Sequence, residues 1–339
     1  MLPAIAVGEA LRERGASVTF AGSPDRVEAR LVAEAGFEFD GFRVAGLPRR
    51  PGVELACSLV RAGGAVRRSR RILRRRRPDV VLGAGSFVAG PMVLAAASMR
   101  IPAALTEADA HLGLANRLAA PFARRVFLAY ELDGLGPPKY RVVGRPIPAR
   151  SRLLSRAEAR ARLGLPPGGR ILGVFGARAG AKSLNELAVE TWGKEGPVVL
   201  HLSGERDYEA LQSRVERPDY HLLPTVDEFG AALSAVDLAL SRSGGTVWEL
   251  AAAGLPAVLV PYPHATSDHQ TKNARYFERG GGAVTVPEVE LVRAPGLVES
   301  LLTNDSRLGE MRDAMLRLAR PDAADQIAEE LIELAGARR

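Results

Sequence analysis

Short apolar runs alternate with helix-like segments along the chain, and glycine or proline separates most of them. Residues 2–14 carry apolar side chains at helical spacing, and GASVTFAG (15–22) has the apolar run of a strand. The following SPDRVEARLVAEAG (23–36) predicts a capped helix that ends at a glycine. Helices and strands that alternate through short connections indicate an α/β fold with a parallel sheet.

The same alternation runs to about residue 148 and then begins again. In the first half, strands are predicted within 78–85, 102–109, 124–130 and 140–148, and helices at about 90–99 and 111–123. In the second half, strands are predicted to begin near 170, 197 and 220, and helices to begin near Asp207, at a cap of Thr225 or Asp227, and at Asp322. A basic, proline-rich stretch, Pro146 to Arg152, is the predicted linker. We therefore expect two Rossmann-like, doubly wound domains with a cleft between them.

The start of the chain departs from this plan. A doubly wound domain usually opens with a strand, and the turn from that strand into the first helix holds the ligand. Here the chain begins inside the first helix. We expect that a first strand and its glycine-rich loop are missing, so that the N-terminal domain, 1–148, is incomplete. The other predicted parts are a C-terminal domain, 149–320, and a final helix, 321–339, that packs back on the N-terminal domain.

Composition narrows the class of protein. Of the 339 residues, 47% are hydrophobic and 25% are charged, as in globular enzymes. No run of apolar residues is long enough to span a membrane. Cys57 is the only cysteine, which excludes an internal disulfide framework and a cysteine-based zinc site. Charged residues interrupt the first dozen positions, so no secretory signal is predicted and the cytoplasm is the expected compartment.

The net charge of +7 is concentrated in one place. Eight arginines fall within eleven residues: Arg67, Arg68, Arg70, Arg71, Arg74, Arg75, Arg76 and Arg77. The run suits either an anionic membrane surface or the solvated face of a helix. No interleaved aromatic residues or known motif accompanies it, so we predict no nucleic-acid partner.

The richest stretch for chemistry runs from Leu238 to Asn273. It predicts a strand, a Ser-Gly-Gly turn, a helix that opens at Thr246, a second strand and a second helix. Such a turn presents free N–H groups and a positive dipole end to a phosphate. Arg242 before the turn suits a diphosphate, and Glu249 one turn into the helix suits a ribose diol. The alternative is an ordinary strand–helix crossover in which the glycines only shape the turn.

Two other places are candidates. The strand at 102–109 delivers Thr106, Glu107 and Asp109 at its carboxyl end, where open α/β sheets bind ligands. These acids are candidates for chemistry or for the cap of the next helix. The small-residue loop from Gly176 to Gly180 carries Arg178 and suits a nucleotide, although it is not a Walker motif.

Taken together, several stretches resemble the MurG family of glycosyltransferases. They are GSPDRVEARLVAEAGFEF (22–39), GAGSFVAGPMVLAA (83–96), LGLANRLAAPFARRV (112–126), GARAGAKSLNE (176–186), SRSGGTVWELAAAGLPAVLVPYPHATSDHQTKNA (241–274) and the final helix. The family transfers N-acetylglucosamine from UDP-N-acetylglucosamine to undecaprenyl-pyrophosphoryl-muramoyl-pentapeptide in peptidoglycan synthesis. The resemblance implies the two-domain GT-B architecture and an inverting transferase that is peripheral on the cytoplasmic face of the membrane.

The resemblance also implies roles for residues. It places the donor in the second domain, with Glu249 on the ribose, the backbone of Val226 on the uracil, and Gln270 and Asn273 on the sugar hydroxyls. The implied diphosphate site is formed by Gly244, Gly245 and Thr246, with Arg242 before them, and Arg178 and Ser243 are the other implied donor-binding residues. It places Phe87 with the arginine run on the membrane- and acceptor-facing surface.

The resemblance leaves three activities open. They are this transfer, another GT-B activity (a different acceptor, or a UDP-sugar 2-epimerase), and UDP-sugar binding without catalysis. For a transferase, Asp109 and Glu107 are the candidate bases, although the family usually has an asparagine at the position of Asp109. We predict no metal and no cofactor, because no Asp-x-Asp pair lies in a suitable place.

Overall fold

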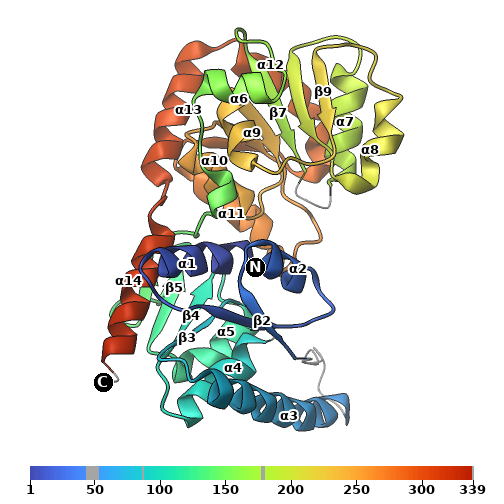
Figure 1. The fold of residues 1–339 in the computed structure, drawn as a ribbon. Helices are drawn as coiled ribbons and strands as arrows, with labels where there is room; N and C mark the ends of the chain where they lie inside the picture. The colour runs from blue at the N-terminus through green and yellow to red at the C-terminus, as the bar shows by residue number, and fades with distance from the viewer. Residues whose placement is uncertain (43–52, 86–87, 177–179, 338–339) are drawn as a thin grey trace. The chain divides into compact units, whose positions relative to one another are not determined.

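The computed structural model describes residues 1–42, 53–85, 88–176 and 180–337, with the backbone alone for 53–62. The chain folds as two compact units, which Figure 1 shows as a ribbon. Unit 1 consists of Met1–Pro148 with Pro321–Arg339, and unit 2 is Ala149–Arg320.

Unit 1 has its described strands in two parallel sheets. Its helices are α1 (Leu2–Glu13), α2 (Val27–Glu34), α3 (Val53–Arg76), α4 (Ala89–Ser98), α5 (Leu114–Ala119), η1 (Ala120–Phe122) and α14 (Ala323–Gly336). Its strands are β1 (Thr19–Gly22), β2 (Glu38–Gly41), β3 (Val81–Gly83), β4 (Ala103–Glu107), β5 (Arg125–Leu128) and β6 (Tyr140–Val142). Strand β1 pairs with β2, and the other sheet has the order β3-β4-β5-β6. One continuous doubly wound sheet would need a strand between β1 and β3, and no described residue pairs with both.

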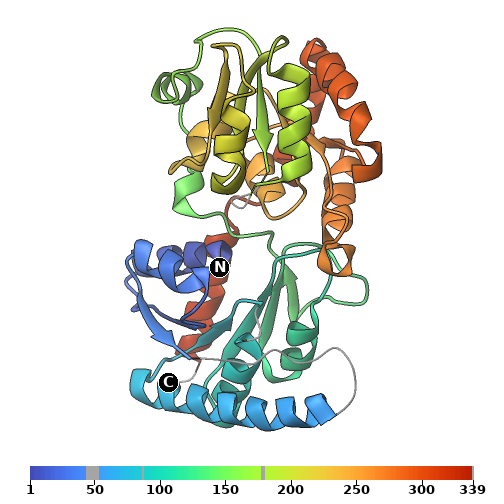
Figure 2. The ribbon, with the colours of Figure 1, turned by 90° about the vertical axis from the view of Figure 1, so that its right-hand side faces the viewer.

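The last helix belongs to unit 1. In Figures 1 and 2, α14 lies beside α1, although more than three hundred residues separate them in the sequence. Ala6 and Ala10 of α1 pack against Ala324 and Ala328 of α14, and these small side chains let the two helices approach closely. Arg14 at the end of α1 forms ion pairs with Asp325 at 2.8 Å and Glu329 at 3.2 Å.

Unit 2 has a single six-stranded parallel sheet. Its strands are β7 (Ile171–Phe175), β8 (Val198–Leu202), β9 (Tyr220–Leu223), β10 (Leu238–Ser241), β11 (Ala257–Leu259) and β12 (Ala283–Thr285). Its helices are η2 (Ala149–Ser151), α6 (Arg156–Arg162), α7 (Lys182–Trp192), α8 (Glu205–Gln212), α9 (Phe229–Ala235), α10 (Thr246–Ala252), η3 (Thr266–Asp268), α11 (His269–Arg279), η4 (Glu288–Arg293), α12 (Ala294–Leu302) and α13 (Asp305–Leu318). The strand order is β12-β11-β10-β7-β8-β9, so the direction of winding reverses between β7 and β10. A ligand of such a sheet binds beyond the carboxyl ends of the strands at this switch point.

The predicted cap of α9 is wrong, whereas α8 begins close to its predicted start. Helix α9 begins after Glu228, and neither Thr225 nor Asp227 caps it; α8 begins at Glu205, near Asp207. No hydrogen bond from a cap side chain marks either start. Gly204 before α8 has φ +81°, a conformation that glycine adopts without strain.

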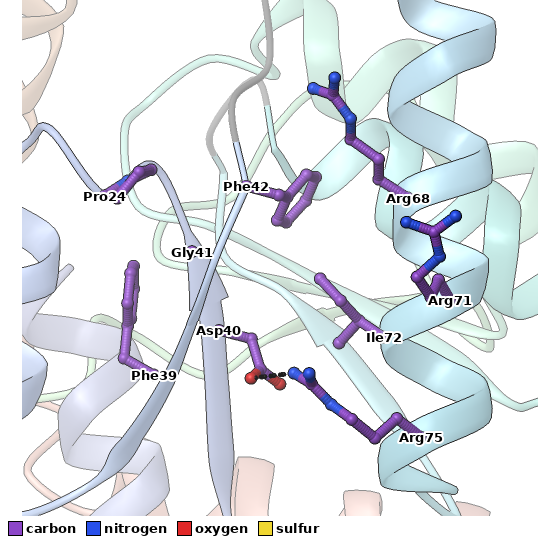
Figure 3. A pocket seen from close by; sticks show the side chains of 9 residues that line it. All are labelled: Pro24, Phe39, Asp40, Gly41, Phe42, Arg68, Arg71, Ile72 and Arg75. Carbon is purple, nitrogen blue, oxygen red and sulfur yellow. Dashed lines mark hydrogen bonds and ion pairs between the residues drawn. The ribbon is translucent and has the colours of Figure 1, made fainter.

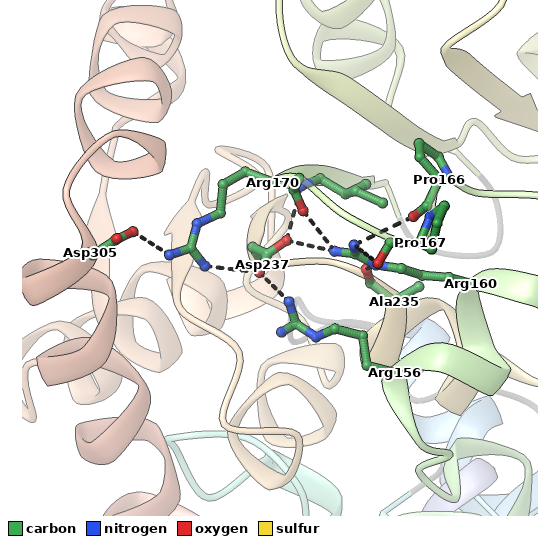
Figure 4. Close-up of polar contacts among 10 residues, drawn as sticks. Arg156, Arg160, Pro166, Pro167, Arg170, Ala235, Asp237 and Asp305 are labelled. Carbon is green, nitrogen blue, oxygen red and sulfur yellow. Dashed lines mark hydrogen bonds and ion pairs between the residues drawn. The ribbon is translucent and has the colours of Figure 1, made fainter.

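A buried carboxylate lies at the amino ends of the central strands of unit 2, opposite their ligand-binding ends. Asp237, just before β10, accepts a hydrogen bond from the N–H of Ile171 at the start of β7, at 3.0 Å. It also forms ion pairs with Arg156 and Arg160 of α6 at 2.5 and 3.0 Å, and with Arg170 at 3.1 Å. Figure 4 shows the arginines converging on this side chain. The network fastens α6 to the amino ends of the central strands.

Candidate functional site

The switch point of unit 2 brings two predicted loops together. Strand β7 leads into the loop that begins at Gly176, and its neighbour β10 leads into the turn at Arg242–Gly245. Because parallel strands end at the same edge of a sheet, both loops lie at the ligand-binding edge. The predicted strand, turn and helix opening at Thr246 are confirmed.

The turn before α10 is fixed from behind by buried side chains. The hydroxyl of Ser243 donates to the carbonyl of Gln270 at 2.8 Å, and the Asn273 amide donates to the carbonyl of Ser243 at 3.2 Å. Both side chains are fully buried. These internal contacts shape the turn, and the predicted contacts of Asn273 and Ser243 with the donor stay predictions.

The front of the turn is open for an anion. Gly244, Gly245 and Thr246 are partly exposed, and none of the described residues accepts a hydrogen bond from their N–H groups. The Nε2 atom of Gln270 lies 3.8 Å from the place that a Cβ would occupy at Gly244, while its Oε1 accepts from the N–H of Tyr262. The turn thus offers backbone donors and one side-chain amide on the same side.

Arg242 is held by several neighbours within unit 2. The residue is 8% exposed, and its guanidinium forms an ion pair with Glu288. It also donates to the hydroxyl of Ser183 at 2.8 Å and to the carbonyl of Val260 at 3.2 Å. Burial alone favours the protonated form of Glu288, but the bonds from Arg242 and Ser183 hold the pKa of Glu288 below its usual value. These contacts stabilise the loops around the turn, and the predicted contact of Arg242 with a diphosphate stays a prediction.

Glu249 is the acid of this site. It lies in the first turn of α10, is 9% exposed, and accepts a hydrogen bond from the hydroxyl of Ser151. Val226 is half-buried in the loop between β9 and α9. Of the other two predicted residues, Arg178 and Phe87 both lie outside the described residues.

A buried polar chain under the glycine-rich loop was missed by the sequence analysis. Tyr220 contacts His201 at 2.8 Å, and His201 contacts Asn185 at 3.0 Å. The Asn185 amide donates to the carbonyl of Ser203 and to Asp207, each at 2.9 Å. Because Asn185 donates through its nitrogen, its oxygen accepts from His201 Nε2, which leaves Nδ1 to accept from Tyr220. Burial lowers the pKa of His201 to about 3, so the imidazole is neutral.

The chain of contacts ends at the glycine-rich loop. Gly180 has φ +80°, and a Cβ at this position would lie 2.5 Å from the carbonyl of Ser203. No side chain larger than glycine fits there without movement of the backbone. Polar residues in otherwise apolar strand and helix positions, such as His201 within VVLHL, were the available signal in the sequence.

In unit 1, the two candidate bases differ sharply. The Glu107 carboxylate is buried and accepts from the N–H of Ala108 at 3.0 Å, from the N–H of Gly113 at 2.9 Å and from the Asn116 amide at 2.9 Å. These bonds tie the loop after β4 to the start of α5 and engage both carboxylate oxygens of Glu107. Asp109 is partly exposed, and no described residue makes a hydrogen bond or ion pair with its carboxylate.

The arginine run forms the second half of α3. Arg75 and Arg76 pair with Asp40 of β2, and Arg76 also pairs with Glu38. The other arginines of the run stand partly or fully exposed on the helix. No helix in the described part of the chain is long and apolar enough to cross a membrane. Within the same ranges, no group of three or more histidine, cysteine or acidic side chains is placed to hold a metal ion.

Comparisons with known proteins agree with this geometry. Residues 1–128 match the Glycosyltransferase family 28 N-terminal domain, and residues 171–327 match its C-terminal domain. The UDP-N-acetylglucosamine--N-acetylmuramyl-(pentapeptide) pyrophosphoryl-undecaprenol N-acetylglucosamine transferase of Halothermothrix orenii is 38% identical over 96% of this chain and 93% of its own.

Solved structures give the same picture. Acinetobacter baumannii MurG superposes with a TM-score of 0.78 at 27% identity, covering 98% of this chain and 95% of that one. A UDP-GlcNAc 2-epimerase from Neisseria meningitidis has a TM-score of 0.66 at 16% identity, covering 98% of each chain, and so shares the fold alone.

The two units with parallel sheets, and the glycine turn with open N–H groups before α10 of unit 2, define a two-domain glycosyltransferase of the GT-B type. Within that class, the chain belongs to glycosyltransferase family 28 and, within it, to the MurG family.

Proposed function

We propose that this chain transfers N-acetylglucosamine from UDP-N-acetylglucosamine to undecaprenyl-pyrophosphoryl-muramoyl-pentapeptide, the reaction named for its relatives. The structural observation that supports it best is the turn of unit 2, with donor groups open in front and fixed side chains behind. Near full-length identity to transferases of this reaction supports it independently. A 2-epimerase is less favoured, because its likeness is limited to the fold.

In this proposal the turn holds the donor diphosphate. The N–H groups of Gly244, Gly245 and Thr246 donate to its oxygens, as backbone N–H groups at a helix start bind phosphate in many proteins. Glu249 accepts from the ribose hydroxyls, and the backbone of Val226 pairs with the uracil edge. The amide of Gln270, beside Gly244, meets the sugar hydroxyls, to which an amide nitrogen donates well.

The chemistry is a single displacement at the anomeric carbon. The acceptor hydroxyl oxygen forms the new bond to that carbon while the bond to the UDP oxygen breaks, and its proton passes to the carboxylate of Asp109. The charge that develops on UDP is stabilised by the N–H groups of the turn, since fixed dipoles aimed at developing charge contribute strongly to catalysis. Of the two predicted bases, Asp109 is favoured because the oxygens of Glu107 are already engaged.

The lipid-linked acceptor implies work at a membrane. We propose that the arginines of α3 attract anionic lipids and hold the protein peripherally on the cytoplasmic face of the membrane. Each basic residue near such a surface contributes about 1 kcal/mol, so the run supplies enough attraction for reversible attachment.

The test is transfer of labelled N-acetylglucosamine into the lipid fraction by native protein and by Asp109→Asn. Loss of a general base typically costs about 10²–10⁴ in rate, so kcat should fall by at least a hundredfold while UDP affinity in calorimetry stays the same. Asp79→Asn, a change at an exposed acid of the same unit, is the matched control and should keep full activity. Near-native kcat for Asp109→Asn would exclude Asp109 as the base, and no labelled lipid from native protein would exclude the proposed reaction.

A further inference from the structure

A hollow with a mixed lining lies between β2 and α3 of unit 1. Its cavity volume is about 550 Å³, within the range of small-molecule sites. It is lined by Pro24, Phe39, Asp40, Gly41, Phe42, Arg68, Arg71, Ile72 and Arg75, and Figure 3 shows these side chains. None of them is among the donor-binding residues or the candidate bases assigned above.

The helix contributes one of its faces to the hollow. Arg68, Arg71, Ile72 and Arg75 follow the i, i+3, i+4, i+7 spacing of neighbours on a helix surface. Residues on the adjoining side of the helix, such as Leu73, are buried in the core of unit 1. Figure 3 shows the guanidinium groups of Arg68 and Arg71 at one end of the hollow.

The opposite wall is mainly apolar. On this wall Phe39 is half-buried, Phe42 is 6% exposed and Pro24 is exposed, and Ile72 on the helix side is half-buried. A ligand of this hollow therefore meets cations at one end and hydrocarbon along the wall. Soluble phosphates have no apolar part to match the wall. Single-stranded nucleic acid needs exposed aromatic faces for stacking, which the buried Phe42 does not offer.

The charges of the lining are not balanced within the hollow. Its only acid, Asp40, is bonded to Arg76 at 2.8 and 3.0 Å and is paired with Arg75. The Arg76 bonds hold the pKa of Asp40 below its usual value, so the carboxylate stays charged and committed to these two arginines. Arg71 has no acidic partner among the described residues, and an incoming anion would meet its guanidinium first.

We propose that this hollow binds a single anionic phospholipid from the membrane surface. Arg71, with Arg68 beside it, binds the phosphate of the head group, and Phe39 and Ile72 pack against the first methylenes of an acyl chain. This inference rests on the proposed attachment to a membrane and deepens it. Attachment then includes one specific lipid site in addition to diffuse attraction by the arginine run.

The first test separates a specific site from diffuse attraction. Binding to vesicles of phosphatidylglycerol and phosphatidylcholine is measured by sedimentation for native protein, Arg71→Ser and Arg74→Ser. Both changes remove one charge from the same helix, but Arg74 is exposed and does not line the hollow. Loss of one diffuse charge weakens binding about fivefold, which is the expectation for Arg74→Ser, whereas Arg71→Ser should weaken it about 25-fold or more. Equal losses would overturn the specific site.

The second test needs no bilayer. Monomeric dihexanoyl phosphatidylglycerol is titrated into the protein by calorimetry, with glycerol phosphate as the soluble head group. We expect saturable binding of the short-chain lipid, at least tenfold weaker binding for Ile72→Ser, and no detectable binding of glycerol phosphate. Equal binding of glycerol phosphate would show a phosphate site without an apolar part and would overturn the lipid assignment. If the short-chain lipid binds but vesicles do not, membrane attachment fails while the lipid site stands.

Discussion

The side chain of Glu249 is buried and lies in the first turn of α10, the helix that follows the turn at Gly244 and Gly245. A buried carboxylate needs hydrogen-bond donors, and Ser151 supplies one from within the same unit. A ribose hydroxyl that bonds to this carboxylate would therefore meet a preorganised acceptor. Both the affinity for UDP and its dependence on the ribose should rest on this residue.

The change Glu249→Ala should weaken binding of UDP-N-acetylglucosamine by about 1–3 kcal/mol, the range for a hydrogen bond to a charged group. Calorimetry with UDP measures it, and Ser151→Ala is the control, since it removes the internal partner but leaves the carboxylate. Deoxy-UDP should bind native protein and Glu249→Ala equally. Unchanged UDP affinity for Glu249→Ala would contradict the donor assignment.

The buried His201 makes the stability of unit 2 depend on pH. Its pKa is about 3 in the folded protein, against 6.5 without burial. Because the unfolded chain then binds a proton more readily, this contribution to stability is intact above pH 6.5 and falls as the pH drops from 6.5 towards 3. At pH 5 the loss is roughly 2 kcal/mol, from about 1.4 kcal/mol for each pH unit.

Urea unfolding of unit 2 at pH 7 and pH 5 measures this loss. His201→Asn should lower the free energy of unfolding at both pH values. The difference between pH 7 and pH 5 should be about 2 kcal/mol smaller than in native protein. His264→Asn, at an exposed histidine, should keep the native difference. If the loss of stability between pH 7 and pH 5 were equal in native protein and His201→Asn, the imidazole would not be buried in its neutral form.

Single residues show where sequence reasoning reaches and where it stops. Glycines after an apolar run predict a turn because the pattern is local, and the turn at Gly244 is where it was expected. The partner of Arg242 is Glu288, which lies 46 residues away, and no local pattern points to it. Asn273 likewise looks like a ligand in the sequence, but in the fold it is fully buried against Ser243.

At the scale of elements, Asp237 decides how α6 is attached. Its side chain is fully buried, and burial by itself would raise its pKa. The N–H of Ile171 and the Arg156 guanidinium instead hold the pKa of Asp237 below its usual value. The nearly buried Arg160 also donates to the carbonyl of Ala235 at 2.9 Å, so that helix, strand and loop share one network.

The change Asp237→Asn should destabilise unit 2 by about 3–5 kcal/mol, because it leaves the buried Arg160 without its counter-charge. Chemical unfolding at neutral pH measures this, and Asp305→Asn is the control, since Asp305 pairs with Arg170 but is 83% exposed. A loss below 1 kcal/mol for Asp237→Asn would show that carbonyl groups alone hold Arg160.

Prediction of elements was best where apolar runs were unbroken. Strands β7, β10 and β11 are buried throughout, and their continuous apolar sequences identified them. Helices α12 and α13 were not predicted, because no cap signal stands out before α12 and the buried positions of α13 alternate with charged residues. The packing of α13 depends instead on close approaches such as that of Leu318 to Gly280, which only the fold reveals.

At the scale of the whole molecule, each unit has its own core. In unit 1, Val7 and Phe127 pack with Ile327 and Leu331 of α14. In unit 2, a separate cluster includes Leu172, Trp192 and Met311. Two separate cores favour two unfolding transitions, each of which responds to changes within its own unit.

Calorimetric unfolding should therefore show two transitions that can be moved independently. Ile327→Ala, at a fully buried side chain, should lower the free energy of unfolding of unit 1 by about 2–5 kcal/mol and its transition temperature accordingly. Ile332→Ala, at a 42% exposed position of the same helix, is the matched control with little effect. UDP at a hundred times its Kd should raise the free energy of unfolding of unit 2 alone, by about 2.7 kcal/mol. A shift of the unit 2 transition by Ile327→Ala would contradict separate cores.

The return of α14 to unit 1 has a consequence for synthesis. The surface of α1 at Ala6 and Ala10 is made first, but its cover, Ala324 and Ala328, is made last. At a translation rate of about 5–20 residues per second, the ribosome needs on the order of 10 to 30 s to make the intervening Ala149–Arg320. Unit 2 can fold in that time, while nascent unit 1 keeps an apolar strip exposed and open to chaperones. The unit that comes first in the sequence is thus the last to be completed.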